Sequence, residues 1–233
     1  MRVAIMQPTF LPWLGYFALI ESVDKFVFLD VVQFESRSWQ QRNRILINKE
    51  ARWLTVPTTL PYGRNTLINQ VLINSEHYSG ESVLKTLKQA YGNKPGFEFI
   101  ERNLFKAILS PPNHLSLMNV QLIKNISQSL GFNTSFILAS ELNVSGNKAD
   151  LLLDISKTLG ATTYVSPPGS RVYLDDYAGF SDSGISLEYQ NFNHPIYPQG
   201  PDVFISHLSV IDAICNTNLE GTRELIQEGS KSE

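Results

Sequence analysis

The first residues whose types suit ligand chemistry follow a short apolar run at the start of the chain. Residues 2–6 (RVAIM) are typical of a buried strand, and the two prolines of residues 7–12 predict a loop. Ligands of open parallel sheets bind beyond the carboxyl ends of the strands, where a helix N-terminus offers free N–H groups to phosphate or carboxylate. The alternative is a loop that only packs its aromatic side chains. The binding hypothesis assigns five residues here: Gln7, Thr9, Trp13, Tyr16 and Gly15, whose missing side chain would allow close approach to the backbone.

Arginines and amides form a second group at residues 36–44 (SRSWQQRNR). Guanidinium forks suit phosphate and carboxylate, and strand alternation places Arg42 and Arg44 on one face, beside Asn43. The alternative is an exposed basic edge that pairs with acidic neighbours. Asp30 and Gln33, after the second apolar run, would complete a polar pocket. Asp30 could bind a ribose, hold a metal or act as a base, although an aspartate in such a place more commonly caps a turn.

Two further groups lie in the C-terminal half of the chain. Residues 166–173 (SPPGSRVY) are rich in turn formers and predict a loop at the same sheet edge, which makes Ser170, Arg171 and Tyr173 binding candidates; the alternative is a surface turn. His194 lies in an Asn-His-Pro motif, and a lone histidine is more often structural than catalytic. The four histidines and one cysteine lack zinc-site spacing, so we expect no metal. P-loop, G-x-S-x-G and G-x-G-x-x-G motifs are also absent, which disfavours the corresponding enzyme classes.

Hydrophobic periodicity predicts the elements that position these residues. Strand, loop, helix and strand follow one another within the first thirty residues, and residues 136–165 repeat this βαβ pattern, which builds parallel sheets. The predicted fold class is α/β, a Rossmann-like parallel sheet with flanking helices. We expect one domain over residues 1–228, with a β-rich insertion at 31–76, a helical segment at 77–132 and a frayed tail at 229–233.

Capping residues and breaks predict the limits of several elements. Ser79 is expected to cap a helix that ends at Gly92, and Asn113 a helix that ends at Gly131. Residues 31–33 are expected to form a short strand. Further helices are expected over residues 97–109, 148–159, 207–216 and 219–227.

The composition excludes several classes of protein. Of the 233 residues, 42% are hydrophobic and 18% charged, unlike a disordered chain, and a net charge of −3 does not suit a nucleic-acid polymer as partner. No apolar stretch reaches the ~18–20 residues of a membrane span. Cys215 is expected in the core. A single cysteine and an N-terminus without a signal-peptide pattern favour a cytoplasmic location. Aromatic residues at 11% indicate either aromatic-packed irregular structure or an aromatic-lined pocket.

Long strings in both halves of the chain are similar to one family. In residues 7–57 they are QPTFLPWLGYF, DKFVFLDVVQF, SRSWQQRNRI and WLTVP, and in the C-terminal half GATTYVSPPGSRVYLD, HPIYPQ and FISHLSVIDAICN. On these strings the chain resembles the WbqC-like protein family over nearly its whole length. The resemblance implies a bacterial cytoplasmic protein associated with O-antigen and other surface-polysaccharide clusters, and hence amino-sugar or nucleotide-sugar metabolism.

The predicted first βα loop also resembles that of the nucleotidylyltransferase superfamily, in which an H-x-G-H motif opens the helix and binds nucleotide phosphates. Trp13 to Tyr16 occupy these positions, so both histidines are missing. The loop with Ser170 and Arg171 is similar to a late phosphate-binding loop of adenylate-forming synthetases of that superfamily, which implies a phosphate contact for Arg171.

The leading hypothesis is a small-molecule transferase in bacterial surface-polysaccharide (O-antigen) biosynthesis. It would act on a nucleotide-linked sugar, or attach an acyl or aminoacyl group to an amino sugar, with Asp30 or His194 moving a proton. The expected partner is a small anionic ligand, a nucleotide or nucleotide-sugar, with a nucleotide as candidate cofactor and a homo-oligomer left open. The alternative is a non-catalytic nucleotide- or sugar-binding protein with a degenerate nucleotidyltransferase-like site, which the two missing histidines favour.

Overall fold

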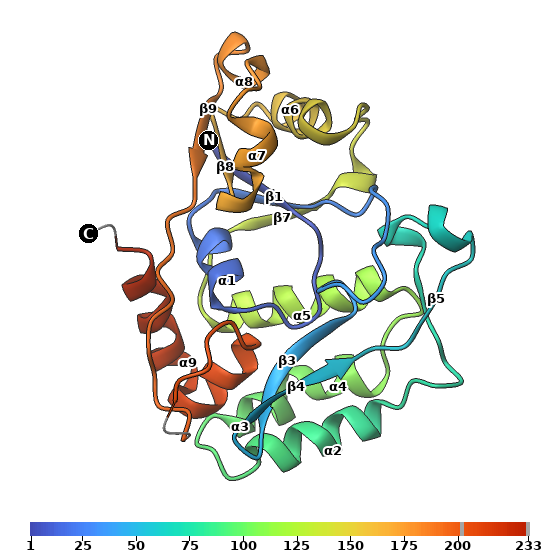
Figure 1. The fold of residues 1–233 in the computed structure, drawn as a ribbon, viewed down its shortest axis with the longest axis vertical. Coiled ribbons are helices and arrows are strands. Elements are labelled where there is room, and N and C mark those ends of the chain that lie inside the picture. The colour runs from blue at the N-terminus through green and yellow to red at the C-terminus, as the bar shows by residue number, and fades with distance from the viewer. Residues whose placement is uncertain (201–202, 232–233) are drawn as a thin grey trace.

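A five-stranded parallel sheet lies at the centre of the protein (Figure 1). The computed structural model describes residues 1–200 and 203–231. The sheet has the order β7-β2-β1-β8-β9, and each neighbouring pair of strands is parallel. The predicted α/β, Rossmann-like fold class is therefore confirmed. The strands are β1 (Arg2–Met6), β2 (Lys25–Phe28), β7 (Ser135–Leu138), β8 (Thr163–Ser166) and β9 (Ser186–Tyr189).

The chain builds this sheet outward from β1 in two directions. β2 and β7 extend it on one side and β8 and β9 on the other, so the strand order reverses between β1 and β8. After β1 the chain enters α1 (Leu14–Glu21), which lies on one face of the sheet; after β8 it enters α7 (Arg171–Leu174) and α8 (Gly179–Asp182) on the other face. In this topology the diverging loops open a crevice at the carboxyl ends of the two strands.

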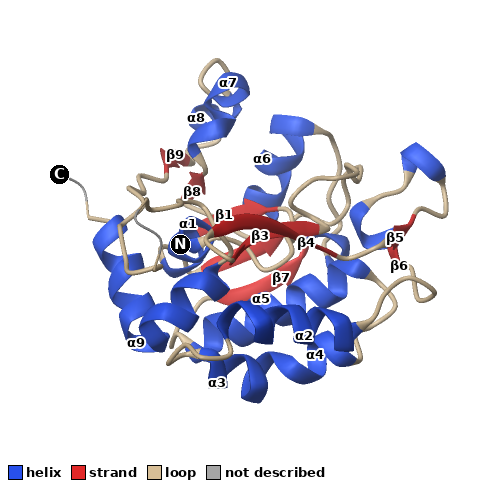
Figure 2. Ribbon diagram, turned by 60° about the horizontal axis from the view of Figure 1, so that its bottom comes forward, coloured by secondary structure: helices blue, strands red, loops and turns tan. Residues whose placement is uncertain are grey.

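Helices cover both faces of the sheet, and the alternation of side chains along the strands determines which core each residue enters. Val3 and Ile5 belong to the core beneath α6 (Lys148–Thr158), α7 and α8. Ala4, Phe26 and Phe28 belong to the larger core with α1, α5 (Leu115–Ser129) and α9 (Val210–Gly229). Figures 1 and 2 show α6 and α8 on one side of the strands and α5 and α9 on the other.

Residues 31–76 contain two small antiparallel sheets outside the central one. Strand β3 of the β3–β4 hairpin contacts α2 and α9, and its Asn43 side chain bonds the loop that follows β1. The prediction of a strand at residues 31–33 is wrong, because in this stretch Gln33 alone pairs, in an isolated bridge with Leu67. The strands are β3 (Arg42–Ile47), β4 (Glu50–Thr55), β5 (Thr58–Thr59) and β6 (Leu72–Ile73), with 3₁₀ turns at Gly63–Asn65 and Ile68–Gln70.

The capping predictions are confirmed for one helix and wrong by one residue for another. The Ser79 hydroxyl accepts a hydrogen bond from Ser82 N at 3.1 Å, so it caps α2 (Gly80–Tyr91), which ends at Gly92 as expected. For α5 the N-cap is His114, one residue after Asn113, and its side chain makes no capping bond. There Leu115 N bonds the backbone of Val71, which supplies the partner that a cap would otherwise provide.

Three other segments differ from the helices and loops expected. Residues 97–109 form α3 (Phe97–Phe99), a π turn (Ile100–Leu104) and α4 (Phe105–Leu109) instead of one regular helix. The two helices expected after residue 207 are present as the two parts of α9, which starts at Val210, three residues later than expected, and is divided at Asn218, where φ is 60° and ψ is −174°. The loop expected after β8 contains a 3₁₀ turn at Pro168–Ser170 and then α7. A further 3₁₀ turn lies at Ala139–Glu141.

Three further predictions concern the end of the chain, its division into segments and membrane-spanning helices. α9 reaches Gly229, and the part of the expected frayed tail at residues 232–233 lies outside the described residues. The division into one domain with an insertion and a helical segment stays a prediction. Within residues 1–200 and 203–231, no helix has the length and apolar character needed to cross a membrane.

Candidate functional site

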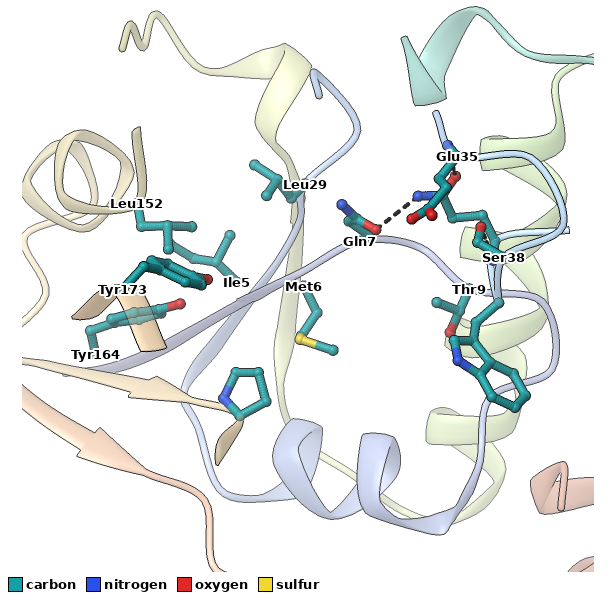
Figure 3. Close-up of a pocket in the computed structure, with 13 residues that line it drawn as sticks. Ile5, Met6, Gln7, Thr9, Leu29, Glu35, Ser38, Leu152, Tyr164 and Tyr173 are labelled. Atoms are coloured by element: carbon teal, nitrogen blue, oxygen red, sulfur yellow. Dashed lines mark hydrogen bonds between the residues drawn. The ribbon is translucent and has the colours of Figure 1, made fainter. Parts of the chain in front are cut away.

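A cleft of about 330 Å³ opens at the carboxyl ends of β1 and β8, where the strand order reverses (Figure 3). One wall comes from β8 and α7 with Leu152 of α6, the floor from β1, and the opposite wall from the loop between β2 and β3. This is the place where Rossmann-like sheets bind their ligands. The cleft is lined by Ile5, Met6, Gln7, Thr9, Leu29, Glu35, Ser38, Trp39, Gln40, Leu152, Tyr164, Pro167 and Tyr173.

Two buried asparagines hold the loop after β1 in place. Asn119 of α5 donates to the carbonyls of Pro8 (3.1 Å) and Gln40 (2.7 Å), which ties this loop to the opposite wall. Asn43 of β3 donates to the Leu11 carbonyl at 2.8 Å, where Leu11 has a φ of 43°. A leucine in the left-handed region is strained, so the surrounding contacts must fix this conformation. The cleft therefore has a wall that the core of the protein holds rigidly.

A chain of amides crosses the cleft from β1 to the opposite wall. Gln40 Nε2 donates to Gln7 Oε1 at 2.8 Å, and Gln40 Oε1 accepts from the backbone N–H of Glu35 at 3.2 Å (Figure 3). Gln40 is buried, whereas the Glu35 side chain is exposed at the cleft. Glu35 is the only charged side chain among the described residues that line the cleft. The amides thus position a carboxyl group beside polar groups able to bind a hydroxylated ligand.

Tyr164 and Tyr173 line the other wall, and two buried serines outside the lining, Ser166 and Ser170, form a hydrogen-bonded group with Tyr164. Ser166 Oγ donates to the Tyr164 hydroxyl at 3.2 Å and lies 2.6 Å from Ser170 Oγ. Burial raises the pKa of Tyr164, so its phenol stays protonated. Figure 3 shows the hydroxyls of Tyr164 and Tyr173 pointing toward the cleft. This wall presents neutral hydrogen-bonding groups rather than charge.

A second cavity of about 240 Å³ adjoins the cleft and shares Met6, Thr9 and Trp39 with it. We call it the aromatic compartment, because most of its wall is aromatic or apolar. The Tyr16 hydroxyl donates to the Gln7 carbonyl at 3.0 Å, so only its ring faces the cavity as a binding surface. The compartment is lined by Met6, Thr9, Pro12, Trp13, Tyr16, Trp39, Asn43 and His207.

Six residues assigned from the sequence line these two cavities. Gln7, Thr9 and Tyr173 line the cleft, and Thr9, Trp13, Tyr16 and Asn43 line the aromatic compartment. Their roles in binding stay predictions.

The contacts of Gly15 give it a role in packing. A Cβ atom there would lie 2.2 Å from the Trp13 ring, so the glycine lets this indole fold over the first turn of α1. The indole therefore fills the space beside the Gly15 backbone that the sequence suggested for a ligand.

Asp30 lies outside both cavities, and its carboxylate is occupied by a turn. Its oxygens accept from Ser140 N (2.9 Å) and Ser140 Oγ (2.7 Å), and the residue is 2% exposed. Asp30 thus caps the 3₁₀ turn at Ala139–Glu141, the commoner role that the sequence left open. Its proton-transfer role has no support in these contacts.

The half-buried arginines of the second group lie on one face of the hairpin, as strand alternation predicted, and Arg44 donates to the carbonyls of Ser206 and His207. The Arg42 guanidinium lies 4.1 Å from the Trp53 ring and that of Arg44 lies 5.9 Å from the Trp39 ring. Both Nε atoms are buried without a hydrogen-bond partner, and neither residue forms an ion pair with a described residue. Neither arginine lines the cleft.

The remaining assigned residues also lie outside the cavities. Arg171 stacks on Tyr189 at 3.9 Å, and Gln33 donates to the Arg64 carbonyl at 2.7 Å. The Ser170 hydroxyl is held by the Pro167 carbonyl.

His194 lies behind the aromatic compartment rather than in its wall. Its ring stacks on Trp13 with 5.9 Å between centroids, and burial lowers the pKa of His194. Its Nε2 atom is buried and has no hydrogen-bond partner. A proton-transfer role for His194 stays a prediction.

Sequence reasoning did not assign several residues that line the cavities. Glu35 lies five positions after Asp30 in the same loop, and it lines the cleft whereas Asp30 does not. The chain fold brings His207 beside Trp13, with 4.7 Å between ring centroids, which no spacing in the sequence indicates. The unassigned polar and aromatic residues are Glu35, Ser38, Trp39, Gln40, Tyr164 and His207.

A second polar network, centred on Asp212, is closed to the cleft. Asp212 Oδ1 accepts from the Tyr91 hydroxyl (2.9 Å), and Oδ2 accepts from the Tyr197 hydroxyl (2.9 Å) and Gln199 Nε2 (3.1 Å). Asp212 is fully buried, and burial raises its pKa against the opposing effect of these hydrogen bonds. The network joins α2, α9 and the segment before α9.

Residues 7–224 of the chain match the model of the WbqC-like protein family. The chain belongs to this family. The matched range holds every residue that lines the two cavities except Ile5 and Met6. Rv1507c of Mycobacterium tuberculosis (strain ATCC 25618 / H37Rv), an uncharacterized protein, is 29% identical over 221 residues, which cover 94% of this chain and 95% of that protein. No solved structure matches the chain.

Proposed function

We propose that this member of the WbqC-like family transfers an acyl or aminoacyl group to the amine of an amino sugar, as a step in bacterial surface-polysaccharide biosynthesis. The observation that carries the proposal is the cleft between β1 and β8, in which Glu35 is the only charged side chain of the described lining. A carboxylate suits an ammonium group, and the surrounding amides and hydroxyls suit the ring hydroxyls of a sugar. The family resemblance supports the polysaccharide setting.

Direct transfer requires the cleft to hold the amine against an activated acyl donor, such as a thioester or an acyl phosphate. The amine nitrogen attacks the carbonyl carbon, the new N–C bond forms, and the leaving group departs with the electron pair of the broken bond. The bound ammonium first gives one proton to Glu35, which frees the electron pair of the nitrogen for this attack, and the second proton that the nitrogen loses leaves with the departing group. The Gln7 amide nitrogen, which is turned away from Gln40 in Figure 3, can donate to the carbonyl oxygen as negative charge develops on it.

A nucleotide-linked amino sugar fits the same proposal. Trp39 lines the cleft and also lies beneath Arg44, so a ligand that leaves the cleft along Trp39 reaches the face with Arg42 and Arg44. Guanidinium groups in that place suit the phosphates of a carrier.

The second candidate is a non-catalytic sugar- or nucleotide-binding protein. Trp13 and Tyr16 favour it, because they stand where nucleotidylyltransferases carry the histidines of the H-x-G-H motif.

Mass spectrometry of the purified protein with amino sugars and acyl donors tests the proposal. The Glu35→Gln variant removes the proton acceptor with little change of shape, and we expect it to lose about a hundredfold in rate. Glu101→Gln, an exposed change on the helical segment, is the matched control and should keep full activity. Binding without product across the panel would favour the second candidate, and full activity of Glu35→Gln would refute the role of Glu35.

A further inference from the structure

The aromatic compartment is a separate chamber that opens onto the proposed reaction site. It shares Met6, Thr9 and Trp39 with the cleft, so a ligand spanning both cavities would pass along these three side chains. On the far side it is closed by Trp13, whose ring packs against Phe192, His194 and His207. The chamber therefore extends the cleft in one direction and ends in an aromatic wall.

The polar groups of the compartment have little capacity left for a charged ligand. The Asn43 amide donates to the carbonyls of Phe10 and Leu11, and its oxygen accepts from Arg44 N. The pKa of His207 is lowered by burial and by the nearby Arg44 guanidinium, so its imidazole is neutral at neutral pH. Among the described residues no Asp, Glu, Lys or Arg lines this chamber.

We propose that the aromatic compartment binds the apolar part of the acyl donor, a single uncharged ring or a short branched chain. This inference rests on the proposed function, because it names the donor class for the same site. The size fits: the chamber has about 240 Å³, and a dry apolar cavity of about 150 Å³ binds benzene. No charged side chain of the described lining would compensate the desolvation of a charged group there, and that desolvation is costly.

The shared wall then places the reacting atoms. With the apolar group between Trp13 and Trp39, the donor carbonyl lies near Met6 and Thr9, next to the cleft that holds the amine. The compartment would thus select the donor, while Glu35 would select the acceptor.

Binding of three ring probes to the full chain tests the inference independently of any transfer assay. Benzyl alcohol is neutral, whereas benzoate and benzylammonium carry one charge on the same ring. Calorimetry or ligand-observed NMR should show benzyl alcohol binding at least about tenfold more tightly than either charged probe. His207→Trp fills the chamber from its exposed rim and should weaken benzyl alcohol by at least about tenfold. His77→Trp is the matched control, because His77 is exposed and does not line the compartment, so benzyl alcohol should bind this variant as it binds the wild type.

Tryptophan fluorescence gives a readout that does not depend on the folding of the His207 variant. The chain has three tryptophans, and Trp53 lies outside the compartment, so Trp53→Phe leaves only the two that line it. We expect benzyl alcohol to change the emission of Trp53→Phe in step with its binding.

The outcomes separate the two proposals. Benzoate binding as tightly as benzyl alcohol, unchanged binding to His207→Trp, or emission that does not respond would overturn the compartment as an apolar subsite. If amino sugars are acylated but donors with an apolar ring react no better than acetyl donors, the inference fails and the proposed function stands. If the ring binds as expected and no amino sugar is acylated with any donor, the proposed function fails and only the apolar specificity of the chamber remains.

Discussion

The Asp212 network and the Gln7–Gln40–Glu35 network both join side chains that are far apart in sequence, but their surroundings differ. Asp212 lies in the core with three donors of this chain on its carboxylate. In the second network only Gln40 is buried, and Glu35 reaches the cleft with its carboxyl group outside the amide chain.

The difference separates a stabilising network from a binding one. A fully buried carboxylate that accepts three hydrogen bonds from its own chain is not accessible to a ligand, so substitutions there should affect folding. A carboxylate held by its backbone at the edge of a cleft adds little to stability and keeps its oxygens for a ligand. The two networks should therefore respond in opposite ways to substitution.

The largest effect on stability is expected for Asp212→Ala. This change leaves the Tyr91 and Tyr197 hydroxyls and the Gln199 amide buried without an acceptor, which should lower the free energy of unfolding by about 3 kcal/mol or more. Urea denaturation measures it, and Tyr197→Phe, which removes one donor alone, should cost about 1 kcal/mol. A loss below that of Tyr197→Phe would show that Asp212 is not the centre of this network.

Asn119→Ala is expected to cause a smaller loss of stability and also to weaken ligand binding. The carbonyls of Pro8 and Gln40 would lose their buried donor, at a cost of about 1–3 kcal/mol, and the loop that bears Gln7 and Thr9 would loosen. Benzyl alcohol should therefore bind more weakly to this variant. Asn125→Ala on the same helix removes a more exposed hydrogen bond and is the control. Unchanged binding of benzyl alcohol by Asn119→Ala would show that the hydrogen bonds of Asn119 to Pro8 and Gln40 do not shape the cavities.

Titration of Asp212 should make the free energy of unfolding depend on pH, an effect smaller than the losses expected for Asp212→Ala and Asn119→Ala. Burial raises its pKa in the folded state above the unfolded value of about 3.9, so the folded state holds this proton more tightly. That contribution is complete below the unfolded pKa and is lost as the pH rises through the folded pKa. The unfolding free energy of the wild type, minus that of Asp212→Asn, should fall as the pH rises from about 4. A difference that rises over this range would mean that the hydrogen bonds to Asp212 outweigh its desolvation.

The sequence predicted those parts of the fold that depend on local pattern. β1, α1 and β2 follow from the apolar runs and the two prolines of residues 7–12, and α6 begins at Lys148 as expected and ends one residue early. The strand order was not predictable in this way, because the return of the chain from β7 to the far side of β1 leaves no mark on any single segment. Likewise, the π turn at Ile100–Leu104 interrupts a segment whose periodicity is helical.

The site was predictable in its location more than in its residues. The loops after β1 and β2 do border the cleft, as the rule for parallel sheets requires. Whether Asp30 or Glu35 faces it depends on Ser140, which lies 110 positions from Asp30 and occupies its carboxylate. Gly15 was assigned to a ligand because glycine permits close approach, and in the structure the Trp13 ring makes that approach. Long-range partners decide such cases, and local spacing does not contain them.

The smallest effect on stability is expected for Glu35→Gln, which should leave the free energy of unfolding within about 0.5 kcal/mol. Its effect on binding tests the central claim most directly, through calorimetry of glucosamine and N-acetylglucosamine with the wild type and with Glu35→Gln. We expect the wild type to prefer the free amine by about tenfold or more, a difference of about 1.4 kcal/mol, and the variant to lose that preference. Equal binding of the two sugars by the wild type, or a preference that survives in Glu35→Gln, would contradict the assignment of the cleft to an amino sugar.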